Sequence, residues 1–239
     1  MIDLQSIEKA YERVSSVVHR TPFAYAPNLS EISGYEVYLK KENLQRTGAF
    51  KLRGAFNRIA ALVERGKKGG VVAASAGNHA QGVAFSAKYF NIDATIVMPE
   101  STPLTKVQGV KELGAKVILH GANYDEAYAY AKEYGDKYGL DFVHPFEDED
   151  VISGQGTVAI EMIGDEPDLD AIVVPVGGGG LISGISIAAK AINPDIKVIG
   201  IAAAGAPAMK KSFDAGTPID STSVRTIADG IAVRDTSEI

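Results

Sequence analysis

Three short stretches of the chain carry residues that could do chemistry together. Two are glycine-rich turns that follow apolar runs, and they consist of Ser75, Ala76, Gly77, Asn78 and His79, and of Gly177, Gly178, Gly179, Gly180 and Leu181. Backbone N–H groups at a turn before a helix bind anions, because the unpaired donors and the helix dipole point to the same spot. The third stretch supplies Lys51, a potential nucleophile. Together they predict a ligand with two anionic ends, such as a phosphorylated cofactor joined to a carboxylate substrate.

Lys51 stands out from the other lysines by its position. A lysine taken at random is a solvated surface group, but Lys51 lies about one turn into a predicted helix whose start Thr47 and Gly48 signal. The positive end of the helix dipole and the apolar neighbours Phe50 and Leu52 both disfavour the ammonium form, so we expect a lowered pKa. An uncharged amine can form a Schiff base with an aldehyde and can afterwards act as a general base.

The run of four glycines exceeds what a tight strand-to-helix connection requires, which favours close approach of the backbone to a ligand. The alternative is that each turn is only a connection and that Asn78 is only a helix cap. The dinucleotide pattern G-x-G-x-x-G fails at this run, because its last position falls on Ile182 or Ser183. The phosphate-loop pattern G-x-x-x-x-G-K-[ST] is also absent, so the sequence disfavours a nucleotide cofactor.

Short apolar runs alternate with helical patterns along the chain. The candidate strands cover residues 37–40, 70–75, 94–98, 116–119, 171–176 and 198–201. Most are continuously apolar, which is typical of parallel strands buried on both faces. Helical spacing relates the apolar residues from Leu52 to Val63. It also relates a second stripe, which consists of Tyr124, Ala127, Tyr128, Ala131, Tyr134 and Tyr138, and we expect this stripe to pack in a core or interface. This alternation predicts an α/β fold with doubly wound, mostly parallel sheets and with ligands at the carboxyl ends of strands.

Composition excludes several classes of protein. The 239 residues are 46% apolar and 23% charged, with 24 basic and 30 acidic residues and no cysteine. The net charge of −6 and the lack of a basic block argue against a nucleic acid or an anionic membrane as partner. Without cysteine there is no disulfide, thiolate zinc site or cysteine nucleophile. No apolar stretch approaches the roughly 18 residues of a membrane span and no signal peptide is visible, so we expect a cytoplasmic protein.

Polar stretches at residues 45–48 and 145–150 suggest the domain boundaries. Residues 1–47 and 148–239 are predicted to form a larger domain, and residues 48–147 a smaller domain inserted into it. In this arrangement the two glycine-rich turns come from different domains and face one cleft.

These motifs resemble those of the pyridoxal-phosphate-dependent serine/threonine dehydratases of fold type II, a family that also includes serine racemase. The resemblance runs from His19 to Val233, and its motifs are residues 40–45, 48–55, 75–82, 154–157 and the glycine run. It implies that Lys51 is the Schiff-base lysine, that Phe50 packs against the ring of pyridoxal 5'-phosphate, and that Asn78 reaches the ring hydroxyl. It also implies that the residues from Gly177 to Leu181 cradle the phosphate and that those from Ser75 to His79 hold the substrate carboxylate.

The resemblance implies conversion of L-threonine or L-serine to a 2-oxo acid and ammonia by α,β-elimination. The alternatives are another enzyme of the same fold type, such as a serine racemase or a β-replacement enzyme, and a core of the family with weak or no activity. Serine racemases have a serine where Ala76 stands, and an alanine cannot protonate the substrate, so racemisation is disfavoured. Metal-linked members carry a carboxylate where this chain has residues 202–204, all alanine, so no metal site is expected.

Length is the largest departure from the family pattern. Family catalytic domains continue well past the segment that matches residues 226–233, so the large domain is predicted to be truncated at its C-terminus. The truncation would remove a hydroxyl group that partners the cofactor's ring nitrogen, so we expect poor catalysis. It would also uncover part of the larger sheet, so we expect a homo-oligomer, most simply a dimer.

Overall fold

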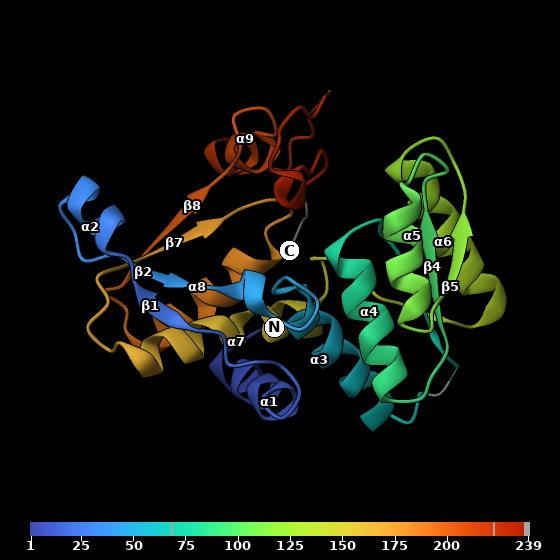
Figure 1. The fold of residues 1–239 in the computed structure, drawn as a ribbon, viewed down its shortest axis with the longest axis horizontal. Helices are drawn as coiled ribbons and strands as arrows, with labels where there is room; N and C mark the ends of the chain where they lie inside the picture. The colour runs from blue at the N-terminus through green and yellow to red at the C-terminus, as the bar shows by residue number, and fades with distance from the viewer. Residues whose placement is uncertain (68, 222, 237–239) are drawn as a thin grey trace.

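The computed structural model describes residues 1–67, 69–221 and 223–236 and shows alternating helices and strands (Figure 1). In chain order the elements are α1 (Leu4–Val14), β1 (Phe23–Tyr25), α2 (Pro27–Ser33), β2 (Tyr38–Lys40), η1 (Glu42–Leu44), α3 (Lys51–Glu64), β3 (Val71–Ala74), α4 (Asn78–Tyr89), β4 (Ala94–Met98), α5 (Leu104–Glu112), β5 (Lys116–Leu119), α6 (Tyr124–Tyr138), β6 (Asp141–Phe142), α7 (Glu149–Asp165), β7 (Ala171–Pro175), α8 (Gly180–Ile192), β8 (Lys197–Ile201), α9 (Ala208–Ala215) and η2 (Asp229–Ile231).

A four-stranded parallel sheet with the order β5-β4-β3-β6 forms one part of the molecule. Every residue of β3 and β4 is buried, as their continuous apolar sequences predict. Residues of α3, α4 and α5 pack against one face of this sheet, and Ala127 and Ala131 of α6 pack against the other face. Helices on both faces of a parallel sheet confirm the predicted α/β class.

The second part contains the parallel pair β7–β8 and the antiparallel pair β1–β2. Helices α1, α7 and α8 pack against one face of β7 and β8. Ile172 and Val174 are buried there, whereas Val173, Ile199 and Ile201 on these strands are 62%, 43% and 51% exposed. The prediction that these two strands are buried on both faces is therefore wrong, because the helices that cover them lie on one side only.

Helix α7 lies between α3 and α8 and contacts the backbone of both (Figure 1). A Cβ atom added to Gly154 of α7 would lie 2.6 Å from the carbonyl oxygen of Arg53 in α3. A Cβ atom added to Gly184 of α8 would lie 2.3 Å from the carbonyl oxygen of Ile152 in α7. Glycines at both crossings thus let three helices pack backbone to backbone, which fixes the beginnings of α3 and α8 relative to each other.

Two local predictions need correction. Helix α3 begins at Lys51 itself, and Thr47 does not cap it: within the described part of the chain its buried hydroxyl has no hydrogen-bond partner. The predicted stripe of α6 packs against the sheet through Ala127, Ala131, Tyr128 and Tyr134, but its two ends do not, since Tyr124 and Tyr138 are 42% and 55% exposed. Among the described helices, none combines the length and apolar character needed to cross a bilayer.

Candidate active site

Lys51 is the first residue of α3 and is partly buried. Its Nζ donates a hydrogen bond of 2.9 Å to the carbonyl oxygen of Pro145 and lies 5.5 Å from the centre of the Phe50 ring. Burial lowers the pKa of the amine from 10.5 to about 8. The predicted lowering of this pKa is confirmed, and a larger fraction of the amine is uncharged near neutral pH than for a surface lysine.

The glycine run faces Lys51 across a small cavity. This cavity of about 30 Å³ is lined by Phe50, Lys51, Phe146, Pro175, Gly177, Gly178, Gly179, Gly180, Leu181, Ile182, Gly230, Ile231 and Val233. Gly179 precedes α8 with a φ of 91°, a left-handed conformation that favours glycine, and no side chain in the described structure caps this helix. The structure therefore brings Phe50, Lys51 and the uncapped N-terminus of α8 together, although they are about 130 residues apart in sequence.

Phe146 is a residue of this site that the sequence did not indicate. A Cβ atom added to Gly178 would lie 2.3 Å from Cδ1 of Phe146, and one added to Gly180 would lie 3.0 Å from its Cβ. A Cβ atom at Gly177 would lie 3.0 Å from Cγ2 of Val233. A Cβ atom at Gly179 would lie 2.9 Å from Cε of Met209. All four glycines therefore leave room for neighbouring side chains, in addition to any role toward a ligand. Phe146 follows β6, and a strand of only two residues leaves no pattern in the sequence that could have pointed to this position.

The turn from Ser75 to His79 connects β3 to α4. Gly77 takes the N-cap position and Asn78 is the first helical residue without a capping hydrogen bond, so the interpretation of Asn78 as a helix cap is wrong. The Oγ of Ser75 accepts a hydrogen bond of 3.2 Å from the N–H of Gly77. Ala76 is partly buried against the core of the four-stranded sheet. None of these residues lines the cavity next to Lys51.

His79 and His144 are both held neutral near Lys51. Burial lowers the pKa of His79 to about 3 and that of His144 to about 4, and the positive charge of Lys51 adds to both shifts. Nε2 of His79 contacts the carbonyl oxygen of Val143 at 2.9 Å, so this nitrogen carries the proton, while Nδ1 has no partner among the described residues. Nδ1 of His144 accepts hydrogen bonds from the N–H groups of Phe146 and Glu147.

Because the pKa values of His79 and His144 are lowered, we expect the free energy of unfolding to fall at acid pH. Because both pKa values are lower in the folded state than the unfolded value of about 6.5, the unfolded state binds more protons as the pH falls below 6.5. The stabilisation is complete above that pH and is lost toward pH 4 and below, by about 1.4 kcal/mol per pH unit for each histidine. In urea unfolding at pH 7 and pH 5, His79→Gln should lose less stability than the unmodified chain.

The exposed His120 provides the control for this experiment. His120→Gln should retain the full loss of stability between the two pH values. An equal loss in the His79→Gln chain would contradict the assignment of a buried neutral imidazole.

The chemistry of the site fits pyridoxal phosphate. The uncapped N-terminus of α8 suits a phosphate, the amine of Lys51 suits an aldehyde, and Phe50 offers an apolar wall for a ring. A cavity of about 30 Å³ is far smaller than the roughly 300 Å³ of a typical ligand pocket. Binding therefore requires lining side chains such as Phe146 to shift.

The fold and this site define an α/β protein in which a reactive amine faces a helix N-terminus suited to an anion. The family model for pyridoxal-phosphate dependent enzymes matches residues 14–239, and the chain belongs to this family. Two curated relatives are named L-threonine ammonia-lyase. The one from Thermotoga maritima is 53% identical over all of this chain and 60% of its own length, and the one from Geobacter sulfurreducens is 45% identical over 98% of this chain and 58% of its own.

Solved structures show the same fold. The processed form of threonine deaminase isoform 2 from Solanum lycopersicum superposes with a TM-score of 0.93 at 41% identity, over 98% of this chain and 65% of that chain. Maize serine racemase superposes with a TM-score of 0.95 at 40% identity, over 99% of this chain and 72% of that one. The chain thus has the fold of pyridoxal-phosphate enzymes of fold type II and spans about 60% of the length of the two curated relatives.

Proposed function

We propose that Lys51 binds pyridoxal phosphate covalently, with loss of water between its amine and the cofactor's aldehyde. The observation that carries this proposal is the amine of lowered pKa that shares a cavity with the uncapped N-terminus of α8. In this arrangement the residues from Gly177 to Leu181 hold the phosphate and Phe50 packs against the ring. Asn78 donates to the ring hydroxyl, and the turn from Ser75 to His79 binds the carboxylate of an amino-acid substrate.

The proposed reaction is the deamination of L-threonine to 2-oxobutanoate and ammonia, with L-serine as a second substrate that gives pyruvate. When bound, the cofactor supplies an electron sink for the carbanion at the α-carbon. The amine of the substrate would first displace the amine of Lys51 from the cofactor, and the freed Lys51 then takes the α-proton. The β-hydroxyl group leaves as water, and one water returns when ammonia is released. Support for threonine comes from the names of the relatives, and Ala76 disfavours racemisation because it carries no proton to donate.

The test of this function is an assay of the whole chain, loaded with pyridoxal phosphate, against L-threonine, L-serine and their D-isomers. The proposal expects formation of 2-oxobutanoate from L-threonine. Formation of D-serine without a 2-oxo acid would favour the racemase alternative. A chain that binds the cofactor but yields neither product would favour the non-catalytic alternative.

The phosphate role of the glycine run can be tested at Gly179, whose φ of 91° disfavours any side chain. We expect Gly179→Val to weaken binding of pyridoxal phosphate by about 2 kcal/mol, because the backbone of the loop must change. A titration followed by absorbance measures the affinity. Gly34→Val is the matched control, since Gly34 also has a positive φ but ends α2, outside the cavity. Equal affinities in all three chains would mean that the run is only a connection.

We also propose that residues 1–47 and 148–239 form one domain around residues 48–147, and that the protein acts in the cytoplasm as a dimer. The dimer is supported by Val173, Ile199 and Ile201, whose exposed apolar side chains lie on the uncovered face of β7 and β8. Light scattering of the purified chain should give twice the mass of one chain, and Val173→Lys should shift the mass toward the monomer. A monomer before the substitution would contradict the dimer.

A further inference from the structure

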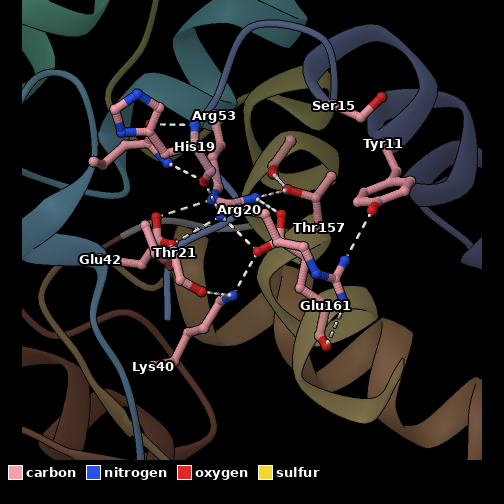
Figure 2. Close-up of polar contacts among 12 residues, drawn as sticks. Tyr11, Ser15, His19, Arg20, Thr21, Lys40, Glu42, Arg53, Thr157 and Glu161 are labelled. Carbon is pink, nitrogen blue, oxygen red and sulfur yellow. Dashed lines mark hydrogen bonds and ion pairs between the residues drawn. The ribbon is translucent and has the colours of Figure 1, made fainter. Parts of the chain in front are cut away.

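A network of buried charges joins α3 to β2, η1 and α7. Its members are Lys40 at the end of β2, Glu42 in η1, Arg53 in α3 and Glu161 in α7 (Figure 2). The side chains of Arg53, Glu161 and Lys40 are 0%, 2% and 5% exposed, and that of Glu42 is 13% exposed. Two positive and two negative charges balance each other, so the network is neutral as a whole.

The N–H donors of the Arg53 guanidinium group are taken up by Glu42 and Glu161 of this network and by the neighbouring Thr157. Nε and Nη2 donate to the two carboxylate oxygens of Glu42 at 2.9 and 2.8 Å. Nη1 and Nη2 donate to the two oxygens of Glu161 at 2.8 and 2.9 Å, and Nη1 also donates to Oγ1 of Thr157 at 3.2 Å (Figure 2). A planar guanidinium group that is hydrogen-bonded to carboxylates on two sides has a single orientation. The ammonium group of a lysine could not make the same set of hydrogen bonds.

Arg53 and Lys51 are two residues apart, so their side chains leave α3 about 200° apart around the helix axis. Fixing Arg53 on one side therefore fixes the direction in which Lys51 points on the other. The partner Glu161 belongs to α7, and α7 also contacts the backbone of α8 through Gly156 and Gly184. Helix α7 is thus a common support for Arg53 and for the helix that begins at the glycine run.

We propose that Arg53 is a positioning residue for Lys51, and this proposal rests on the role of Lys51 in binding the cofactor. Its ion pairs with Glu42 and Glu161 set the rotation of α3 so that the amine faces the N-terminus of α8. Buried ion pairs are weak contributors to net stability, because removing two charges from water offsets most of their attraction. Their geometry is directional, however, and orientation of an attacking group strongly affects its rate of reaction.

The experiment compares Arg53→Lys with Arg13→Lys in the full chain. Arg13 is the matched control because it also donates two hydrogen bonds to one carboxylate, that of Glu64 at the far end of α3. Competitive labelling with acetic anhydride across a pH series, without cofactor, gives the pKa of the Lys51 amine. Two further measurements are the rate of covalent attachment of pyridoxal phosphate and the affinity for pyridoxine 5'-phosphate, which has the phosphate but no aldehyde.

We expect Arg53→Lys to move the pKa of Lys51 upward toward 10.5, because the amine is released from its partly buried position. Covalent attachment should be slowed about tenfold or more, while the affinity for pyridoxine 5'-phosphate changes by less than about twofold, since α8 is untouched. Arg13→Lys should change none of the three quantities. If circular dichroism shows that Arg53→Lys does not fold, Glu42→Gln, which keeps the shape of the side chain, replaces it and should give smaller shifts in the same direction.

Two results would overturn this role. One is an unchanged labelling pKa and attachment rate in the folded variant, and the other is an equal loss of attachment rate and pyridoxine 5'-phosphate affinity, which would indicate general damage to the site. Failure of the unmodified chain to attach the cofactor at Lys51 would contradict the proposed function instead. In that case the labelling pKa alone still decides whether Arg53 positions Lys51.

Discussion

Chains that carry Lys51→Ala should no longer attach pyridoxal phosphate covalently but should remain folded. Lys51 provides the partly buried amine that faces the glycine run, and burial lowers its pKa to about 8. Removing a lysine whose charged form is disfavoured in the folded state costs little stability near neutral pH. Borohydride reduction of the chain with the cofactor, followed by peptide mapping, measures the attachment, and circular dichroism checks the fold.

Lys116→Ala serves as the control, because Lys116 is an exposed residue of β5, the edge strand of the four-stranded sheet. The control should attach the cofactor as the unmodified chain does. A stoichiometric label on any lysine other than Lys51 would refute the assignment.

The second large effect concerns the crossing of α7 and α8. A Cβ atom at Gly184 would lie 2.3 Å from the carbonyl oxygen of Ile152 and 2.6 Å from the backbone nitrogen of Gly156. Both are backbone atoms of α7, so the helices must separate. We expect Gly184→Ala to lower the free energy of unfolding by about 3 kcal/mol or more, measured by urea denaturation.

Gly109 in α5 is the matched control for this substitution, since a Cβ atom there meets nothing within 4 Å. Gly109→Ala should raise the free energy of unfolding by about 0.5 to 1 kcal/mol, because alanine favours the helix. Similar changes at both glycines would mean that the α7–α8 contact is looser than the structure shows.

The fold could be predicted where the sequence of an element reflects its own environment. Strands β3 and β4 are buried at every position, and Thr95 is their only polar residue, because helices cover both faces of their sheet. The mostly apolar β7 and β8 led to the same prediction, but whether a second layer covers a strand depends on segments elsewhere in the chain. Strands β1 and β6 have only three and two residues, too few for a periodic pattern to show.

Some residues of the candidate site could also be predicted from local sequence, whereas others depend on contacts between distant segments. Lys51 and the run from Gly177 to Gly180 could be found from the sequence because their chemistry is unusual for the position they occupy. Phe146 could not be found, because its contact with Gly178 depends on how the chain returns after β6. The charge network around Arg53 was also missed, since its members are spread from residue 40 to residue 161 and only the packing of α3 against α7 brings them together.

The most direct test of the central claim is an absorbance titration of the purified chain with pyridoxal phosphate, run beside the Lys51→Ala chain. The account predicts a saturable yellow band at one cofactor per chain, bleached by borohydride, which the Lys51→Ala chain lacks. Equal colour in the two chains, or no colour beyond that of the free cofactor in either, would contradict it.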